Sequence, residues 1–315
     1  MRQNIKGTIT MNIAQDLKIE TQRPTAVAVG FFDGVHRGHR AVIEAALAHK
    51  PNGLDTCVFS FSIKSASPEK KKGARLLQTP SLKAKSVEAL GADWLLTPDF
   101  TQFKGLSPEQ FALDVLMRGF NAKVVCCGYD YHFGKGACAG AKELAALLEP
   151  HGVAVEQIGA VLDNGLPVSS TRIREALASG EIETANRLLG RPYAIDFPVS
   201  HGRRLGHQLG FPTANQIIGE EYAQLRFGVY ATQVLIDGKV HAAVTNVGIK
   251  PTVGSDSVGA ESYILDWSGD LYDKPVETRF LSFLRPEQKF ESLEALKTAI
   301  RKDADRARAL TQNTN

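Results

Sequence analysis

Residues 30–40 read Gly-Phe-Phe-Asp-Gly-Val-His-Arg-Gly-His-Arg, and they follow the apolar run of residues 26–29. An apolar-periodic stretch, residues 41–49, comes directly after them. This order predicts a strand, a glycine-rich turn and a helix. A helix start carries unpaired backbone N–H groups and a partial positive charge, so the turn is a candidate phosphate-binding site.

Two histidines in this turn strengthen that interpretation. His36 and His39 are three residues apart, so on the first turn of a helix they share one face. Two imidazoles there can donate to phosphate oxygens and stabilise the charge that develops in transfer. Two surface histidines beside a tight turn are the alternative, but the glycines and the flanking strand and helix favour the phosphate site.

The composition is that of an ordinary globular protein, and it argues against several classes of function. The chain has 315 residues, 43% of them hydrophobic and 23% charged, and a formal net charge of +3. So small a charge does not indicate a nucleic-acid partner, and no apolar run approaches the roughly 20 residues that span a bilayer. The four cysteines form no Cys-x-x-Cys pair, so neither zinc nor thioredoxin-like chemistry is indicated. Because the first residues show no signal pattern, we expect a cytoplasmic protein.

The first half of the chain alternates strand and helix patterns. Candidate strands are residues 26–29, 56–61, 93–97, 123–127 and 153–158, and candidate helices begin at Thr79-Pro80, at Ser107-Pro108 and at Ala141. Short apolar strands that alternate with helices predict a parallel sheet with helices on its faces. Ligands of such sheets bind beyond the carboxyl ends of the strands, where the histidine turn lies.

Near Gly190 the pattern changes to closely spaced strands. Asp237-Gly238 between two β-rich runs is a strong hairpin signal, and the many short strands predict a closed or nearly closed barrel. The expected elements are helices at residues 171–179 and 182–189 and strands at residues 229–236, 239–247, 262–267 and 278–284. A last helix, capped by Ser292, should run over residues 293–310 and pack on the barrel through Leu293, Leu296, Ala299 and Ile300.

Two further runs are candidate ligand sites in the first half. Residues 168–174 place three hydroxyls and two arginines at a helix start, where Ser170 or Thr171 can be the N-cap and the other polar groups could hold a polyphosphate. A plain cap with surface arginines is the alternative. Asp130 follows the strand at residues 123–127, so it could orient a substrate hydroxyl; a turn with packed aromatic residues is the alternative there.

A separate candidate site lies in the second half. Thr213 and Asn215 offer hard oxygen ligands two residues apart, so on a strand they face the same side and suit a Mg²⁺ ion that bridges nucleotide phosphates. Residues 246–252 are expected to end a strand in a polar turn. Glu261, at the start of the next expected strand, could take a proton from an attacking hydroxyl. The alternative is an edge strand that ends in an Asn turn, with a solvent-facing glutamate.

Five runs together carry a resemblance to a known family. They are Phe-Asp-Gly-Val-His-Arg-Gly-His (32–39), Ser-Ser-Thr-Arg-Ile-Arg (169–174), Leu-Leu-Gly-Arg-Pro-Tyr (188–193), Leu-Gly-Phe-Pro-Thr-Ala-Asn (209–215) and Gly-Asp-Leu-Tyr (269–272). In this order they resemble the bacterial bifunctional riboflavin kinase/FMN adenylyltransferase family, also called FAD synthetase. The resemblance implies a Rossmann-like α/β nucleotidyltransferase domain with a parallel sheet at residues 1–185. It also implies an antiparallel β-barrel riboflavin kinase domain with a terminal helix at residues 186–315.

The resemblance also implies two reactions and their sites. The C-terminal domain would convert riboflavin to FMN with ATP and Mg²⁺, and the N-terminal domain would convert FMN to FAD with ATP, releasing pyrophosphate.

The implied catalytic residues are Glu261, His36 and His39. The implied ATP-binding residues of the N-terminal domain are Gly30, Phe32, Asp33, Gly34, His36, His39, Ser170, Thr171 and Arg174, with Asp130 at the flavin or nucleotide site. In the C-terminal domain, Gly202, Gly206, Gly210, Thr213 and Asn215 would bind ATP, and Thr213 and Asn215 would also bind Mg²⁺. The expected partners are small molecules, with neither nucleic acid nor membrane, and this interpretation allows a homo-oligomer.

Three positions depart from the family pattern. Residues 61–65 lack the Pro-His-Pro of the family, Tyr131-His132 stands where the family has Phe-Arg, and Glu261-Ser262-Tyr263 keeps the glutamate but lacks a histidine. Two alternatives therefore remain: a riboflavin kinase whose N-terminal domain is inactive or altered, and a flavin- or nucleotide-binding sensor without turnover. The intact Glu261 and histidine pair argue against the sensor, because binding alone needs no base.

Overall fold

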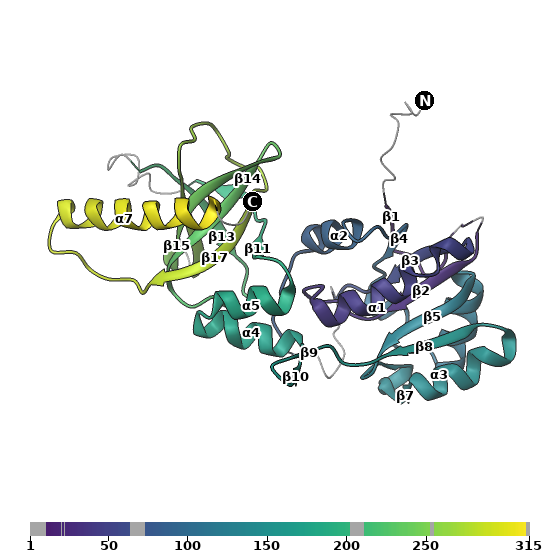
Figure 1. Ribbon diagram of the computed structural model, residues 1–315. Coiled ribbons are helices and arrows are strands. Elements are labelled where there is room, and N and C mark those ends of the chain that lie inside the picture. The colour runs from purple at the N-terminus through teal and green to yellow at the C-terminus, as the bar shows by residue number, and fades with distance from the viewer. Residues whose placement is uncertain are drawn as a thin grey trace, which may run out of the picture. The chain divides into compact units, whose positions relative to one another are not determined.

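The computed structural model describes residues 11–19, 21, 23–63, 73–201, 211–252 and 255–312. The chain divides into two compact units (Figure 1). Unit 1 comprises residues 1–74 and 83–168, and unit 2 comprises residues 75–82 and 169–315. The short segment 75–82 therefore belongs to a unit whose other residues come much later in the chain.

A six-stranded sheet is the centre of unit 1, and all its strand pairs are parallel. The strands, in spatial order, are β1 (Asn12–Ala14), β4 (Trp94–Leu96), β3 (Asp55–Phe59), β2 (Thr25–Val29), β5 (Ala122–Gly128) and β8 (Ala154–Ile158). The order proceeds to one side from β2 to β3 and β4, and to the other side from β2 to β5 and β8. The predicted parallel sheet is confirmed, and its strand order reverses at β2.

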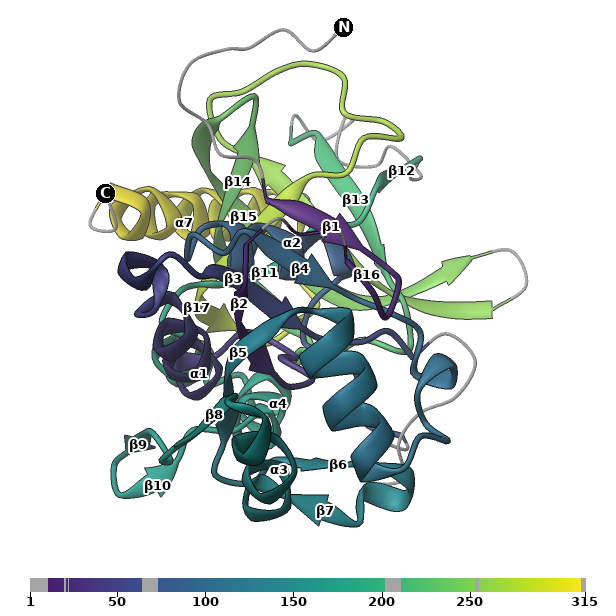
Figure 2. The same ribbon diagram turned by 90° about the vertical axis from the view of Figure 1, so that its right-hand side faces the viewer.

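Helices cover both faces of this sheet, and the alternation of side chains along each strand decides which helix they meet. The helices are α1 (Arg37–Leu47), α2 (Pro80–Glu88), a π-helix (η4, Gln110–Gly119) and α3 (Ala141–Leu148). Ala26 and Ala28 of β2 pack with side chains of α1 and α2. Val27 and Val29 pack with η4 and α3 on the opposite face (Figure 2). Burial on both faces explains the continuous apolar runs of these strands.

Short elements complete unit 1. Two hairpins pair β6 (His132–Phe133) with β7 (Ala139–Gly140) and β9 (Leu162–Asp163) with β10 (Leu166–Pro167). Single 3₁₀ turns lie at Lys50–Asn52, Phe100–Gln102, Lys135–Ala137 and Glu149–His151.

Two helix starts predicted from the sequence are confirmed by their capping bonds. The backbone N–H of Leu82 donates to Oγ1 of Thr79 at 3.2 Å. At the other start, the Gln110 N–H donates to Ser107 Oγ at 3.1 Å and the Ser107 N–H donates to Gln110 Oε1 at 2.9 Å. This reciprocal pair is a capping box, which satisfies two backbone donors that the helix itself leaves open.

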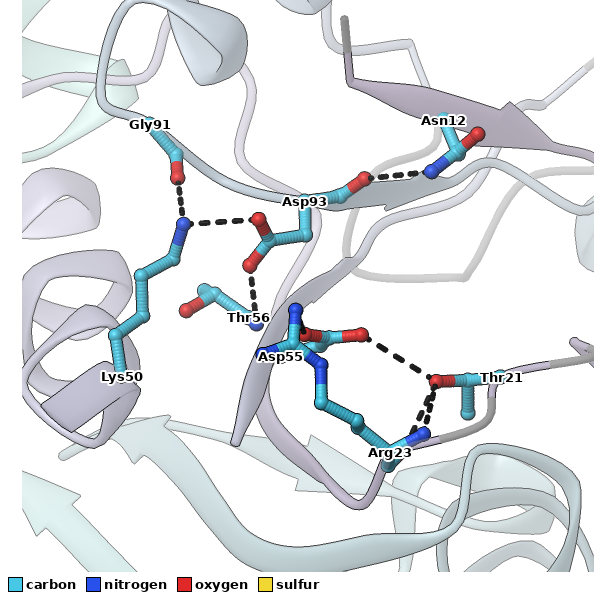
Figure 3. Close-up of polar contacts among 8 residues, drawn as sticks. All are labelled: Asn12, Thr21, Arg23, Lys50, Asp55, Thr56, Gly91 and Asp93. Carbon is cyan, nitrogen blue, oxygen red and sulfur yellow. Dashed lines mark hydrogen bonds and ion pairs between the residues drawn. The ribbon is translucent and has the colours of Figure 1, made fainter. Parts of the chain in front are cut away.

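Charged side chains connect the amino ends of the parallel strands, at the edge opposite the histidine turn (Figure 3). The Asp93 carboxylate, at the start of β4, accepts the backbone N–H of Thr56 in β3 at 2.8 Å and the Lys50 ammonium at 2.9 Å. Asp55, at the start of β3, pairs with Arg23 at 2.8 Å. These contacts join consecutive strands at their starts, so they support the packing of the sheet at its amino edge.

The second unit contains a seven-stranded sheet whose neighbouring strands run antiparallel. The strands, in spatial order, are β11 (Tyr193–Ile195), β17 (Glu277–Arg285), β14 (Gly228–Ile236), β15 (Lys239–Thr252), β16 (Ser255–Ile264), β13 (Thr213–Ile218) and β12 (Val199–Ser200). The two edge strands, β11 and β12, are separated in the chain only by residues 196–198, so the sheet curls and its edges approach. The buried Gln216 amide donates to the carbonyls of Phe197 and Val276, at 2.7 Å each, across this curled sheet. The sheet is an antiparallel half-barrel, in agreement with the predicted class.

Within the described residues, the half-barrel is accompanied by α4 (Ser170–Ser179), α5 (Ile182–Leu189) and α7 (Leu293–Gln312). The predicted Ser292 cap of α7 is confirmed, since its Oγ accepts the Ala295 N–H at 3.1 Å. The predicted packing residues are only partly buried: Leu296, Ala299 and Ile300 are half-buried, and the buried positions lie further along the same helix. Leu293 is 48% exposed, and α7 packs on β14 and β15 through Ala304 and Ala307 (Figure 1). The helix therefore contacts the sheet through small side chains in its second half, which allow a close approach.

Two strand predictions in unit 2 also need correction. Residues 246–252 do not form a turn, because β15 continues through them and pairs with β16 up to Thr252 and Ser255. The strand expected at residues 262–267 starts earlier, at Ser255, and ends at Ile264. The prediction was a polar turn that ends the strand, whereas pairing with a neighbouring strand extends it. In the parts of the chain that the structure describes, no helix has the length and apolar character needed to cross a membrane.

The contacts of Asp93 give a test of the amino-edge cluster. We expect Asp93→Ala to lower the free energy of unfolding of unit 1 by about 2 kcal/mol, because the variant loses the acceptor for a backbone N–H and an ammonium group. Urea unfolding followed by Trp94 fluorescence in a Trp267→Phe background reports on unit 1, because these are the only two tryptophans. Replacement of the exposed Glu88 by Ala is the control, and an equal effect of both changes would contradict the expectation.

Candidate active sites

The first site is the turn between β2 and α1, at the carboxyl edge of the parallel sheet. β2 ends at Val29 and α1 begins at Arg37, so the turn lies where the strand order reverses. Open α/β sheets bind ligands at this point, because the connections on the two sides of the reversal leave in opposite directions and open a crevice. The location predicted from the sequence is therefore confirmed.

The turn has an unusual backbone that its core side chains stabilise. Gly34 has a φ of 89°, which favours glycine, but Phe32 and Val35 also have positive φ angles of 50° and 39°. Such angles cost free energy in residues with a side chain, and they persist where packing fixes them. Here both side chains are 1% exposed and lie in the core with α1 and β2. A Cβ atom at Gly30 would lie only 2.8 Å from the Phe32 ring, so the glycine leaves space for this ring in the core.

The two predicted histidines come together in this turn. His36 is the N-cap of α1, and its Nδ1 accepts the backbone N–H of His39 at 3.2 Å. The rings are stacked with their centroids 3.5 Å apart. Because a backbone N–H can only donate, Nδ1 of His36 is an acceptor, so a neutral His36 carries its proton on Nε2. The turn therefore places an imidazole whose N–H is on Nε2 at the start of α1.

A buried lysine, which the sequence analysis did not single out, supports the same turn. The Lys83 ammonium donates to the Phe31 carbonyl and to Ser60 Oγ, at 2.9 Å each, so it joins the turn after β2 to the end of β3. Burial lowers the pKa of Lys83 to about 8, and the charge of the nearby Asp33 opposes this shift. Asp33 itself is 2% exposed. The sequence indicates the burial of Lys83 only weakly. The residue lies four positions before the buried Val87, so the two share the inner face of α2.

The remaining residues predicted for the first site lie in two places. Asp130 is exposed just after β5, the strand beside β2, so it shares the carboxyl edge with the histidine turn. Ser170, Thr171 and Arg174 lie in α4 of unit 2. The predicted N-cap is wrong: Ser169, rather than Ser170 or Thr171, is the cap, and its Oγ accepts the Arg172 N–H at 3.3 Å. The helix starts one residue earlier than expected, so Ser170 falls inside it.

The second site lies on one face of the half-barrel. Thr213 and Asn215 are in β13, and Asn215 stands directly opposite Glu261 of β16. Opposite residues of antiparallel strands point to the same face, and so do residues two apart, so these three side chains share it. Glu261 lies inside β16, not at a strand start as predicted, because β16 extends six residues before it. Gly202, Gly206 and Gly210 lie outside the described residues.

A lysine connects the two strands that carry this second site. The Lys250 ammonium donates to Asn215 Oδ1 at 2.6 Å and forms an ion pair with Glu261 Oε1. Burial lowers the pKa of Lys250, while the hydrogen bond and the charge of Glu261 oppose the shift. From the sequence, residues 246–252 are expected only to form a turn, so Lys250 is not among the predicted site residues. Long-range contacts of this kind, between positions 35 residues apart, have no signal in a single sequence.

The family comparisons match a different family model to each of two parts of the chain. Residues 18–172 match the family model described as FAD synthetase, and residues 189–311 match the model described as riboflavin kinase. A bifunctional riboflavin kinase/FMN adenylyltransferase from Pseudomonas fluorescens is 38% identical over 291 residues, covering 91% of this chain and 93% of the relative. A protein of the same description from Listeria monocytogenes is 35% identical, covering 90% and 91%. The chain belongs to the bifunctional riboflavin kinase/FMN adenylyltransferase family.

A solved structure shares the fold over almost the whole chain. It is described as a macrolide-efflux protein from Streptococcus pneumoniae, and the similarity has a TM-score of 0.83 at 27% sequence identity, covering 95% of this chain and 99% of that one. The likeness extends across both units, which supports the α/β and half-barrel architecture.

The environment of Lys83 predicts a pH dependence of stability. In the unfolded chain a lysine keeps its proton up to about pH 10.4, whereas in the folded chain Lys83 loses it near pH 8. Between these values the unfolded chain binds more protons, so the contribution of Lys83 to stability rises with pH. We therefore expect the free energy of unfolding of the wild-type chain, relative to Lys83→Met, to increase from pH 8 to pH 10. Urea titrations across this range measure it, and a constant difference would contradict the assignment.

Proposed function

We propose that this enzyme makes FMN from riboflavin and FAD from FMN, with ATP as the donor in both steps. The observation that carries the proposal is that one chain holds two polar sites of different design, each within the part that matches one family model. We assign adenylyl transfer to residues 1–185 and riboflavin phosphorylation to residues 186–315. The relatives are described as bifunctional, so neither a kinase without transferase activity nor a sensor without turnover is favoured.

In the kinase reaction, we assign proton acceptance to Glu261. Its carboxylate would take the proton of the riboflavin 5′-hydroxyl as the oxygen attacks the γ-phosphorus of ATP. Thr213 and Asn215 fit a Mg²⁺ ion, because both offer oxygen ligands on one face and Asn215 Oδ1 already accepts a hydrogen bond from a cationic group. When bound there, the ion would neutralise charge on the phosphates. Gly202, Gly206 and Gly210 would form the phosphate-covering loop.

In the adenylyl transfer, we assign charge stabilisation to His36 and His39. The FMN phosphate would attack the α-phosphorus of ATP, and pyrophosphate would leave with the electron pair of the broken bond. His36 would donate through Nε2–H to an oxygen of that phosphorus, because its Nδ1 is occupied by the His39 N–H. Gly30, Phe32, Asp33 and Gly34 would shape the nucleotide site.

The other predicted residues complete this proposal. Ser170, Thr171 and Arg174 would bind the leaving phosphates, and Asp130 would contact the flavin or the nucleotide. A cytoplasmic location, small-molecule partners alone and a homo-oligomer stay predictions.

Incubation with riboflavin and Mg-ATP, followed by chromatographic separation of riboflavin, FMN and FAD, tests both activities together. FMN alone would support the kinase without transferase activity, and neither product would support the sensor.

Glu261→Gln tests the kinase site. The change removes the proton acceptor but keeps the shape of the side chain, so we expect FMN formation to fall by about 10²–10⁴-fold. FAD formation from supplied FMN should remain at the wild-type rate. Loss of both activities would contradict two separate sites.

His36→Ala tests the transferase site. We expect FAD formation to fall by about 10²–10³-fold, because a donor to the developing charge is lost, while FMN formation continues. The variant also removes the N-cap of α1, which costs about 1 kcal/mol. His36→Asn is the matched control, since Asn is a good N-cap but lacks an imidazole. If His36→Asn forms FAD at the wild-type rate, His36 has a structural role only.

A further inference from the structure

The Lys250 stem crosses the face of the half-barrel above Gly259, while the Glu287 carboxylate occupies the space above Gly248. Gly248 of β15 and Gly259 of β16 stand directly opposite each other. A side chain at Gly259 would lie 2.5 Å from Cδ and 2.6 Å from Cε of Lys250, so the stem of the lysine occupies the space above this glycine. The missing Cβ thus determines the direction of the stem, from its own position opposite Ser257 toward Glu261.

The end of this stem lies between the two groups that the proposed kinase reaction needs. The ammonium holds Asn215 Oδ1 at 2.6 Å and pairs with one oxygen of Glu261. The Lys250 side chain is 18% exposed, so the contact is partly shielded from water. Asn215 is 9% exposed, and its amide nitrogen lies 3.4 Å from the Thr213 carbonyl, which leaves Oδ1 directed at the lysine.

We propose that Lys250 is a built-in competitor of the metal ion at the kinase site. This inference rests on the proposed function, because it takes Asn215 as a metal ligand and Glu261 as the base. The amide oxygen of Asn215 cannot hold an ammonium group at 2.6 Å and a metal ion on the same side, since the two positive charges repel. Binding of Mg-nucleotide therefore displaces the ammonium from Asn215.

The displaced lysine has a second consequence for the base. In the pair with Lys250, one carboxylate oxygen of Glu261 is engaged by a proton donor and is less accessible to a substrate hydroxyl. Release of the ammonium frees this oxygen when the nucleotide arrives, and the flexible stem lets the ammonium reach the phosphates instead. Lys250 is thus a positioning residue that couples occupation of the nucleotide site to exposure of the base.

The experiment measures how much Mg²⁺ strengthens ADP binding, by calorimetry of the full-length chain with Mg²⁺ and with a chelator. The nucleotide site of unit 1 contributes equally to every variant, so differences between variants belong to unit 2. The quantity compared is the ADP dissociation constant with the chelator divided by that with Mg²⁺. In Lys250→Met, which keeps an unbranched stem but removes the charge, we expect this ratio to be about tenfold larger than in the wild-type chain. The Mg²⁺ concentration that half-activates FMN formation should fall correspondingly.

Two further variants separate competition from other roles of the lysine. Gly259→Ala keeps every charge but displaces the stem of Lys250. Mg²⁺ should therefore strengthen ADP binding by this variant more than by the wild-type chain, as in Lys250→Met. Lys250→Arg keeps the positive charge and should remain within about twofold of the wild-type chain. If Mg²⁺ strengthens ADP binding equally, or less, in Lys250→Met than in the wild-type chain, the inference is wrong even though FMN is formed. If the wild-type chain forms no FMN, the result contradicts the proposed kinase function itself, on which the inference rests.

Discussion

The hydrogen bond from the backbone N–H of His39 to Nδ1 of His36 is the contact on which the first site depends. It ends the turn after β2, caps α1 and decides which ring nitrogen carries the proton. The contact requires an extended backbone at His36, and the preceding turn reaches it through positive φ angles at Phe32, Gly34 and Val35. Burial of the apolar side chains of this turn offsets the cost of those angles, so core packing and the position of a polar group are linked.

The second site depends on a different constraint, the alternation of side chains along antiparallel strands. Asn215 and Glu261 share a face because they stand opposite each other on neighbouring strands, and Thr213 joins them two residues away. None of these three residues lies at a helix start. In the proposed function, the two sites would thus bind polyphosphate in different ways, with backbone donors and imidazoles in one unit and with side-chain oxygens in the other.

Much of this architecture could be predicted from local sequence patterns, and the exceptions have a common cause. Capping at Thr79 and Ser107, the buried strands and the order of the elements follow from residues close together in the chain. The true extents of β15 and β16 depend on pairing with each other. The contacts of Lys83 and Lys250 join distant segments, and neither lysine differs from a surface lysine in its local sequence. The roles of the site residues rest on the family resemblance and on geometry together.

Residues 75–82 carry a consequence for how the two units can be separated. Within unit 2, the Leu76 N–H donates to the Glu221 carbonyl at 2.7 Å, and Thr79 Oγ1 donates to the buried Asp196 carboxylate at 2.5 Å. A fragment cut at Ser169 would lack this segment and would leave the Asp196 carboxylate without that hydroxyl. During synthesis, the segment leaves the ribosome long before its partners, so these contacts form only after Asp196 and Glu221 have been made. Unit 2 is therefore not one continuous piece of the chain, because it includes a segment that lies within the sequence of unit 1.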